Sequence, residues 1–355
     1  MRRVKQNTRG RPHGAGLVAP RVLGVTTTDS APISHVNVWR VGDELLVTWR
    51  GGGDVSVFVS NDPIDAGTDV RAPDGPGQAS VERAGRPYVH LFDPERGFTV
   101  AAERLVVMDG VRNFRDIGGY PTIDGGQTRW GQVFRSARLD ETSDDDLERI
   151  RSLGIRKVFD LRTQLEVDNN PNRLPDDVDL VHMPMSSQVA IPKGLFERII
   201  DGDISSYTKA DMAEGYLRML DSFTGYLSTM VRAVADGEKI LFHCTAGKDR
   251  TGITAMTMLA LADVADAHVL DDYEISAQHQ PEGRIEYFST ELIKAGHDPD
   301  MFDLDAMLGS PRPVMRMTLD GMRGRWNDHP GYFDHLGLDA SVRASARENL
   351  RFVQP

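Results

Sequence analysis

The sequence of 355 residues is poor in cysteine, because Cys244 is the single one and no disulfide can form within the chain. Long apolar runs are also missing: no stretch approaches the roughly 18 to 20 apolar residues that cross a bilayer. No apolar segment follows the basic N-terminus, as a signal peptide would require. These absences argue against a disulfide scaffold and a transmembrane protein. We expect a cytoplasmic location, with export by a signal-independent route as the alternative.

The chain also has fewer basic than acidic residues. The chain has 41 Lys and Arg against 53 Asp and Glu, a net charge of -12. The electrostatic potential of a chain with this negative net charge repels polyanions, so general binding to nucleic acid is not expected. A phosphorylated ligand must therefore be captured by a local basic site. A hydrophobic content of 40% is that of a globular chain with a sizeable core.

The first third of the chain has the pattern of short strands. We interpret residues 1–20 as a flexible tail. From residue 21 to 107, apolar residues alternate with polar ones between glycine-rich turns, which predicts a small all-β, sandwich-like domain. Within it, the prolines and glycines of Asp69 to Gln78 predict a long exposed loop.

The pattern changes at about residue 108, where helical and strand-like segments begin to alternate. This alternation predicts a parallel α/β sheet covered by helices on both faces. The segment from Val269 to Pro355 is expected to be mostly helical. The predicted elements are a helix at Leu147 to Leu153, a strand at Lys157 to Leu161, a helix at Phe223 to Ala235, a strand at Lys239 to Phe242 and a helix at Thr251 to Ala262.

The segment with the clearest chemistry is KILFHCTAGKDRTG, from Lys239 to Gly252. A strand, a glycine-containing loop and a helix start turn successive backbone N–H groups toward one point, where a phosphate can sit. Those donors and nearby cations favour the thiolate of Cys244, a nucleophile. Arg250 offers a planar fork for two phosphoryl oxygens. The hydroxyl of Thr251 can hydrogen-bond the sulfur when it leaves, so we expect a phosphocysteine intermediate.

The last ten residues of this segment, HCTAGKDRTG, resemble the phosphate-binding signature of the cysteine-dependent protein tyrosine phosphatase superfamily. They are most similar to the signature of bacterial tyrosine and phosphoinositide phosphatases. Further blocks of that group have counterparts from residue 108 to 355, the region we expect to form the catalytic domain. They are Val111 to Tyr120 (VRNFRDIGGY), Val133 to Leu139 (VFRSARL), Ile155 to Glu166 (IRKVFDLRTQLE) and Tyr332 to Leu338 (YFDHLGL).

The resemblance implies that Cys244 is the nucleophile and Arg250 the transition-state clamp. Lys248 would add a positive charge at the pocket mouth, with a solvated surface lysine as the alternative. Arg115 and Asp116 would lie near the site, where they either contact substrate or form a structural ion pair. His243 either supports the loop or is a histidine satisfied by backbone. The expected substrate-binding residues are His243, Thr245, Ala246, Gly247, Lys248, Arg115, Asp116 and Asp160.

The general acid departs from the family pattern. Relatives of this type carry an aspartate in the segment that here reads His182 to Gln188, which contains no carboxylate. This places Asp249, beside Arg250, first among the candidates, with a structural ion pair as its alternative role. Asp160 is a second candidate, and a loop-capping carboxylate is its alternative.

We therefore expect a phosphatase that acts on phosphotyrosine in proteins, or on phosphoserine, phosphothreonine or phosphoinositides. No metal and no cofactor are expected, because phosphocysteine chemistry needs neither. The run Asp144 to Asp146 is interpreted as a helix start. The alternatives are a catalytically silent phosphate-binding module that recognises its ligands through the β-domain, and, less favoured, sulfur transfer at the cysteine loop.

Overall fold

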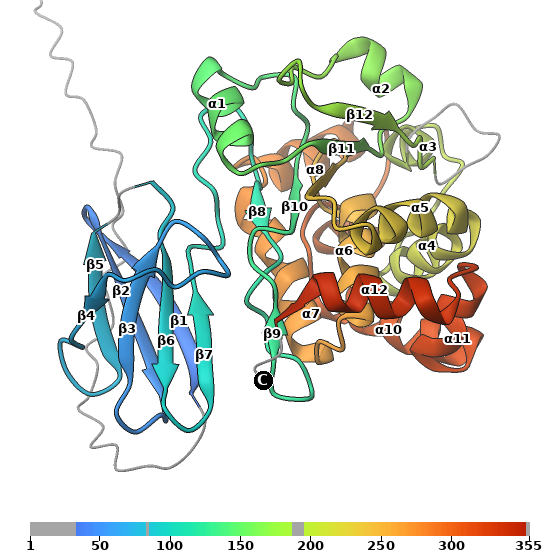
Figure 1. Ribbon diagram of the computed structural model, residues 1–355. Helices are drawn as coiled ribbons and strands as arrows, with labels where there is room; N and C mark the ends of the chain where they lie inside the picture. Colours follow the sequence, from blue (N-terminus) through green and yellow to red (C-terminus); the bar gives the residue numbers. More distant parts are fainter. Residues whose placement is uncertain (1–32, 83–84, 187–194, 353–355) are drawn as a thin grey trace, which may run out of the picture.

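A computed structural model describes residues 33–82, 85–186 and 195–352. An all-β part and a larger α/β part lie side by side (Figure 1). The predicted tail, residues 1–20, lies outside the described residues. No helix within the described ranges is both long and apolar enough to span a membrane.

Two antiparallel sheets make up the N-terminal part. The first has the order β1-β2-β5 and the second the order β4-β3-β6-β7. Alternate side chains of both sheets share one buried apolar cluster, so the sheets face each other. The strands are β1 (Ser34–Val41), β2 (Glu44–Arg50), β3 (Ser56–Ser60), β4 (Val70–Arg71), β5 (Gln78–Glu82), β6 (Tyr88–Asp93) and β7 (Gly97–Ala101).

The predicted loop from Asp69 to Gln78 needs a correction. Val70 and Arg71 form β4, which pairs with the free edge of β3, and Gln78 begins β5. The loop is therefore confined to residues 72–77, the stretch that contains the prolines and glycines.

The α/β part is built on a five-stranded sheet of order β12-β11-β13-β10-β8, in which only β8 is antiparallel to its neighbour. A second, two-stranded sheet pairs β14 with β9 and brings the C-terminal segment beside residue 127, a pairing that the sequence did not predict. The strands are β8 (Arg115–Asp116), β9 (Gln127–Thr128), β10 (Val133–Ser136), β11 (Lys157–Asp160), β12 (Asp179–His182), β13 (Ile240–His243) and β14 (Arg351–Phe352).

Helices cover both faces of the sheet, as predicted. Along β13, Ile240 and Phe242 join the large core beneath α4 to α7 and α10 to α12, whereas Leu241 joins a smaller core with α1. The helices are α1 (Asp144–Ser152), α2 (Gln164–Asn169), α3 (Leu195–Ile200), α4 (Lys209–Ser222), α5 (Thr224–Ala235), α6 (Asp249–Leu261), α7 (Asp266–Ile275), α8 (Arg284–Lys294), α9 (Leu304–Leu308), α10 (Arg312–Trp326), α11 (Asp328–His335) and α12 (Ala340–Leu350), with 3-10 turns η1 (Ser276–His279) and η2 (Pro299–Met301).

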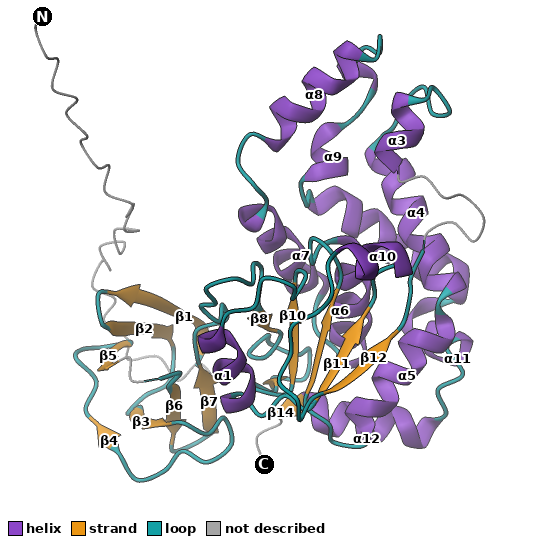
Figure 2. Cartoon of the chain, turned by 90° about the horizontal axis from the view of Figure 1, so that it is seen from above, coloured by secondary structure: helices purple, strands orange, loops and turns teal. Residues whose placement is uncertain are grey.

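Three of these helices stand apart from the layers. The arrows of the large sheet point toward the side of the molecule on which α3, α8 and α9 lie (Figure 2). Because parallel strands carry their ligand sites at their carboxyl ends, this is the side where a functional site is expected.

Hydrogen bonds and an ion pair connect the two parts of the molecule. Trp130 donates its indole N–H to the carbonyl of Val100 at 2.8 Å, and the Gln127 amide makes two hydrogen bonds with the same backbone residue. Arg86 forms an ion pair with the buried Asp116 at 2.8 Å. The domain boundary at residue 107/108 stays a prediction, but the contact across it is specific and partly polar.

We expect Arg86→Met to lower the free energy of unfolding by about 2 kcal/mol, because it leaves the buried Asp116 carboxylate without its cation. The cost stays moderate since the N–H groups of Gly118 and Gly131 still donate to Asp116. Urea unfolding would measure it. The matched control is Arg71→Met, whose ion pair with Asp69 is largely exposed and is expected to contribute under about 0.5 kcal/mol. Equal stability of both variants would contradict the prediction.

Candidate active site

The segment singled out in the sequence forms a tight loop between β13 and α6. Cys244 follows the strand, Asp249 begins the helix, and Gly247 adopts a left-handed φ of +66°. A Cβ on Gly247 would lie 2.5 Å from the carbonyl oxygen of Ser136, so no other residue fits. Within the described part of the chain, the backbone N–H groups of residues 245–248 donate no hydrogen bond. They are available to an anion.

The outer side of the loop is held by side chains from two other segments. Asn113 donates to the carbonyls of Gly247 at 3.0 Å and Ala246 at 3.3 Å, and Arg135 donates to Gly247 at 2.8 Å. Satisfying these carbonyls from outside leaves the N–H groups to the inside of the loop. Both residues lie in blocks that the sequence singled out, but neither had been assigned a role.

Arg115 belongs to a buried ion cluster behind the loop. It donates to Asp272 of α7 at 3.0 Å and also contacts Asn113, while Arg135 pairs with the other oxygen of Asp272. Burial raises the pKa of Asp272, but the two arginines lower it further, so it is ionised well below its ordinary range. With Arg115 fully buried, the structure has the ion-pair alternative, with Asp272 as the partner. No sequence motif pointed to Asp272.

Asp116 faces the N-terminal part instead of the loop. It is fully buried and accepts hydrogen bonds from Arg86 and from the backbone of Gly118 and Gly131. Asp116 does form an ion pair, but the pair joins the two parts of the molecule instead of holding the loop.

The guanidinium of Arg250 is held in place by a carboxylate that had been assigned no role from the sequence. Its two terminal nitrogens donate to the two oxygens of Glu166 at 2.7 and 2.8 Å. Glu166 also accepts from the Thr245 hydroxyl and caps the start of α2 together with Thr163. Burial raises the pKa of Glu166, whereas Arg250 lowers it more, so this carboxylate stays charged. The capping-box spacing from Thr163 to Glu166 was the available signal, and it indicates a helix start only.

The nucleophile candidate lies at the bottom of the loop. Cys244 is 2% exposed. Thr251 is fully buried, and its hydroxyl oxygen has no hydrogen-bond partner among the described residues, so the expected bond to the sulfur is not formed here. His243 contacts the carbonyl of Cys244 at 3.4 Å, and burial lowers the pKa of His243 to about 4. Its ring is therefore neutral at physiological pH and touches the backbone beside the thiol.

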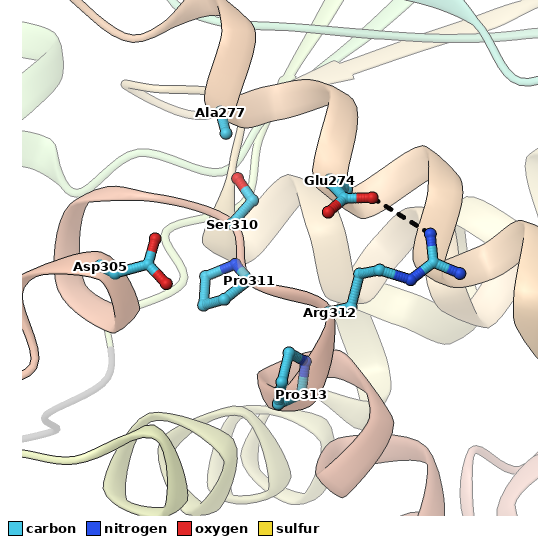
Figure 3. A pocket seen from close by; sticks show the side chains of 7 residues that line it. All are labelled: Glu274, Ala277, Asp305, Ser310, Pro311, Arg312 and Pro313. Atoms are coloured by element: carbon cyan, nitrogen blue, oxygen red, sulfur yellow. Dashed lines mark hydrogen bonds and ion pairs between the residues drawn. The ribbon is translucent and has the colours of Figure 1, made fainter.

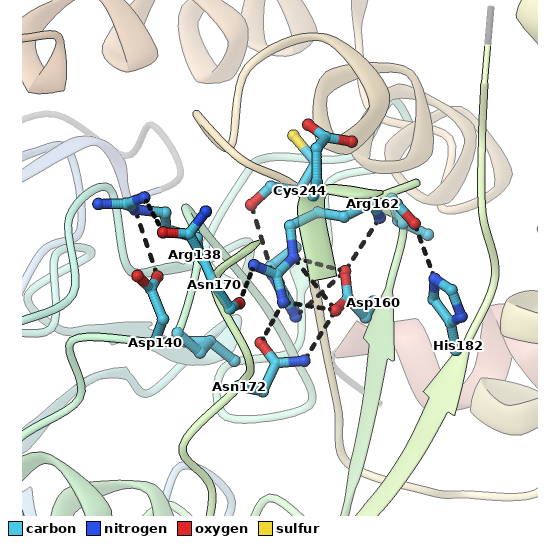
Figure 4. A network of polar contacts seen from close by, with 12 residues as sticks. Arg138, Asp140, Asp160, Arg162, Asn170, Asn172, His182 and Cys244 are labelled. Atoms are coloured by element: carbon cyan, nitrogen blue, oxygen red, sulfur yellow. Dashed lines mark hydrogen bonds and ion pairs between the residues drawn. The ribbon is translucent and has the colours of Figure 1, made fainter. Parts of the chain in front are cut away.

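Asp160 is the centre of a polar network at the end of β11 (Figure 4). It accepts three side-chain bonds from Arg162 and one from Asn172, together with the backbone N–H of Arg162. Burial raises the pKa of Asp160, but the Arg162 bonds and nearby charges bring it down to about 2. Both oxygens of the Asp160 carboxylate are occupied by Arg162 and one also by Asn172, so the structure favours the loop-capping alternative over the general acid.

Lys248 differs from both expectations. It is 2% exposed, and its ammonium donates to the carbonyl of Met307 in α9 at 2.7 Å and lies 3.3 Å from Asp249. It is neither a solvated lysine nor a free charge at the pocket mouth. The carbonyl oxygens at the end of α9 occupy it, a contact that no local sequence pattern reports.

Asp249 is the partly exposed carboxylate of the loop. Its side chain is 36% exposed and accepts a hydrogen bond from the hydroxyl of Tyr216. Burial, and next the charge of Asp249, raise the pKa of Tyr216 well above its ordinary value, so the phenol stays a donor. Among the described residues, Asp249 makes no ion pair with the guanidinium of Arg250, whose carboxylate partner is Glu166.

A pocket of about 280 Å³ lies elsewhere, between α7, η1 and the start of α10 (Figure 3). No candidate site residue lines it, and Arg312 within it is paired with Glu274 at 3.1 Å. In the part of the chain that the structure describes, no three His, Cys, Asp or Glu side chains gather where they could hold a metal ion. The lining residues are Glu274, Ala277, Asp305, Ser310, Pro311, Arg312 and Pro313.

Several known proteins are similar to this chain over part of its length. A protein of Cupriavidus necator named as a tyrosine-protein phosphatase is 30% identical over 209 residues, 56% of this chain and 73% of its own. The triple specificity protein phosphatase PtpB of Mycobacterium tuberculosis is 29% identical over 218 residues, 55% and 76%. A solved structure, the core catalytic domain of the PP-IP phosphatase SIW14 from S. cerevisiae, is 17% identical and covers 55% of this chain and 90% of its own, with a TM-score of 0.28.

The model of the tyrosine phosphatase family matches residues 106–352, which is well over half of the chain and includes the whole loop. The resemblance predicted from HCTAGKDRTG and its companion blocks is thereby confirmed. This protein belongs to the tyrosine phosphatase family and is a phosphatase.

Proposed function

We propose that this protein hydrolyses phosphotyrosine monoesters in proteins through a phosphocysteine intermediate on Cys244. The observation that carries the proposal is the loop itself: the N–H groups of residues 245–248 donate to no acceptor in the described ranges, and they lie between a cysteine and an arginine held by Glu166. These N–H groups and the guanidinium can donate to the three non-bridging oxygens of the phosphoryl group in the transition state of its transfer.

In the first step the thiolate of Cys244 attacks phosphorus, an S–P bond forms and the bond to the tyrosyl oxygen breaks. The leaving oxygen takes a proton from Asp249. Arg250 holds two of the phosphoryl oxygens with its fork, and the loop N–H groups bind the developing charge. Because Glu166 already fixes the guanidinium, little side-chain freedom is lost when the substrate arrives.

In the second step, Asp249 takes a proton from water as the water oxygen attacks phosphorus. The S–P bond breaks, the sulfur leaves as thiolate and inorganic phosphate is released. We infer that the Thr251 hydroxyl, which is buried and has no hydrogen-bond partner among the described residues, donates to that sulfur. Its role belongs to this step because charge returns to sulfur only here.

Phosphotyrosine is the favoured substrate, and phosphoserine, phosphothreonine and phosphoinositides are the alternatives. One relative is named for triple specificity, which supports a breadth beyond tyrosine. The N-terminal sheets are proposed to be a β-sandwich-like domain whose boundary with the catalytic domain lies at residue 107/108. The cytoplasmic location expected from the sequence stays a prediction.

The proposal is tested by trapping the intermediate. The protein is mixed with a phosphotyrosine peptide, denatured within the first turnover, and examined by ³¹P NMR and peptide mapping. Phosphorus on the peptide that contains Cys244 is the expected result. Turnover without a phosphorylated cysteine at any quench time, in a phosphate-release assay run in parallel, would remove Cys244 from the mechanism.

The role of Asp249 makes a prediction about two substrates. Asp249→Asn should lower turnover of a phosphotyrosine peptide at least about tenfold more than that of p-nitrophenyl phosphate, because a stable leaving oxyanion needs little protonation. It should also remove one limb of the pH–rate profile. Steady-state rates on both substrates measure this. Equal losses on both would assign Asp249 a positioning role, and no loss on either would exclude it from proton transfer.

A further inference from the structure

A chain of hydrogen bonds runs from the core of the domain to the phosphate loop. The hydroxyl oxygens of Tyr273 in α7 and Tyr216 in α4 lie 2.8 Å apart, and the hydroxyl of Tyr216 donates to Asp249 at the start of α6. Both tyrosines are 1% exposed, whereas the side chain of Asp249 is partly exposed. Three helices thus contribute to the position of one carboxylate.

The direction of this chain follows from the number of protons in it. A tyrosine hydroxyl donates one hydrogen bond, and Tyr216 uses its proton on the carboxylate of Asp249. Its oxygen can then only accept from Tyr273, so the donors run from Tyr273 to Tyr216 to Asp249. Burial, the largest cause, raises the pKa of both hydroxyls well above the ordinary value, so both keep their protons at physiological pH.

The rings that carry the two hydroxyls are fixed by close packing. They contact each other edge to face, with centroids 6.1 Å apart and an interplanar angle of 83°. A Cβ on Gly252, in the first turn of α6, would lie 3.2 Å from Cδ2 of Tyr273, so that ring lies directly against the backbone of the helix. The Tyr216 hydroxyl is therefore held in place relative to Asp249 by the packing of α4 and α7 on α6.

The two oxygens of the Asp249 carboxylate have different surroundings. Oδ1 accepts from Tyr216 and lies 3.3 Å from the ammonium of Lys248. Among the described residues, none donates to Oδ2. A proton on Oδ1 would displace the hydrogen of Tyr216 and face the cation of Lys248. The proton of the neutral acid is therefore expected on Oδ2.

We propose that Tyr216, supported by Tyr273, is the positioning residue for proton transfer by Asp249: it holds Oδ1 and so leaves Oδ2 as the oxygen that carries the proton. This inference rests on the proposed function, in which Asp249 protonates the leaving oxygen. In that step the O–H bond at Oδ2 breaks, the proton moves to the tyrosyl oxygen of the substrate, and the hydrogen bond from Tyr216 stabilises the carboxylate that remains.

Several other charged or titratable groups surround this carboxylate. All of them are kept when Tyr216 is replaced by phenylalanine, so a changed pH profile in that variant reports the loss of one hydrogen bond. They are Tyr207 before α4, Lys248 in the loop, Arg250 in α6, Tyr273 in α7 and Arg284 in α8, with Asp305 of α9 acting on Tyr273.

The test measures the pH dependence of kcat/KM for a phosphotyrosine peptide in the wild type, Tyr216→Phe and Tyr273→Phe. This ratio reports the steps up to the phosphocysteine, in which Asp249 must be protonated. Loss of a donor favours the protonated carboxyl, so the alkaline limb should move to higher pH by about half a unit to one unit in Tyr216→Phe, and by less in Tyr273→Phe. The maximum should fall by about threefold or more, because the carboxyl can rotate.

Three controls separate positioning from a general effect on the fold. Adding Tyr216→Phe to Asp249→Asn should change neither the rate nor the profile further, because the proton donor is already missing. Tyr332→Phe, which alters a fully buried tyrosine of α11, should keep the wild-type profile. Phosphate should still raise the thermal unfolding temperature of each variant, as expected for an intact loop.

An unmoved limb in Tyr216→Phe, with the limb lost in Asp249→Asn, overturns the positioning role and leaves the proposed function in place. An equal loss from Tyr216→Phe in the wild-type and Asp249→Asn backgrounds also overturns it. If Asp249→Asn keeps the limb, the proton comes from another group, and the positioning role is wrong together with that part of the proposed function. Should Tyr216→Phe fail to fold, a shifted limb in Tyr273→Phe supports the proposal and an unmoved one overturns it.

Discussion

Replacing Cys244 by serine is expected to reduce kcat for p-nitrophenyl phosphate by roughly 10⁴-fold or more. A serine hydroxyl is a weak nucleophile unless a base removes its proton. The neighbouring histidine cannot serve as that base, because the described polar contact of the His243 ring with residue 244 is to its carbonyl oxygen, and its other nitrogen lies 3.7 Å from Asp160. Steady-state rates of the purified variant measure the loss, and mass spectrometry of the intact protein confirms that serine is present at position 244.

The control is ligand binding. Cys244→Ser removes one sulfur atom and leaves the loop N–H groups and Arg250 in place, so phosphate or a phosphotyrosine peptide should still raise its thermal unfolding temperature. A variant that hydrolyses substrate within tenfold of wild type would show that another group attacks phosphorus. A variant that fails both to bind and to turn over would point to a misfolded loop instead.

Arg250→Lys is expected to lower kcat by about 10²-fold or more, although the charge is kept. The guanidinium contacts both oxygens of Glu166 end-on, through its two terminal nitrogens, a two-point geometry that an ammonium cannot copy. Because the arginine acts most strongly on the transition state, kcat should fall more than KM rises. Turnover near the wild-type rate would withdraw the clamp from the mechanism.

Glu166→Gln separates positioning from contact. Glutamine keeps the shape of the side chain but loses the charge that fixes the guanidinium, so a smaller fall in kcat than in Arg250→Lys is expected, together with a lower thermal stability of the start of α2. Restoring the carboxylate with Glu166→Asp, one methylene shorter, should recover only part of the rate.

The core of the site could be predicted because it is contiguous. Cys244, the glycine turn and Arg250 lie within seven residues, and a strand, loop and helix start can be recognised from local pattern alone. The sheet could be predicted for the same reason, since a continuous apolar run such as Ile240, Leu241 and Phe242 is typical of a strand buried on both faces.

What the sequence could not indicate are the partners brought in from a distance. Asp272 lies 157 positions from Arg115, and Met307 lies 59 from Lys248. Local patterns carry no information on such pairs. Lys248 was therefore expected at the mouth of the site, and Asp160 remained a possible acid until the Arg162 bonds and its pKa of about 2 were known.

Glu166 both binds Arg250 and caps the start of α2, so the geometry of the site depends on whether this short helix stays folded. The carboxylate that aligns Arg250 is also the third residue of α2, which has six residues and no buried side chain. Short helices open locally at a smaller free energy than the whole domain unfolds. Each opening of α2 would release the arginine while the sheet and the loop remain intact. Loss of activity on heating or in denaturant is therefore expected before the sheet itself unfolds.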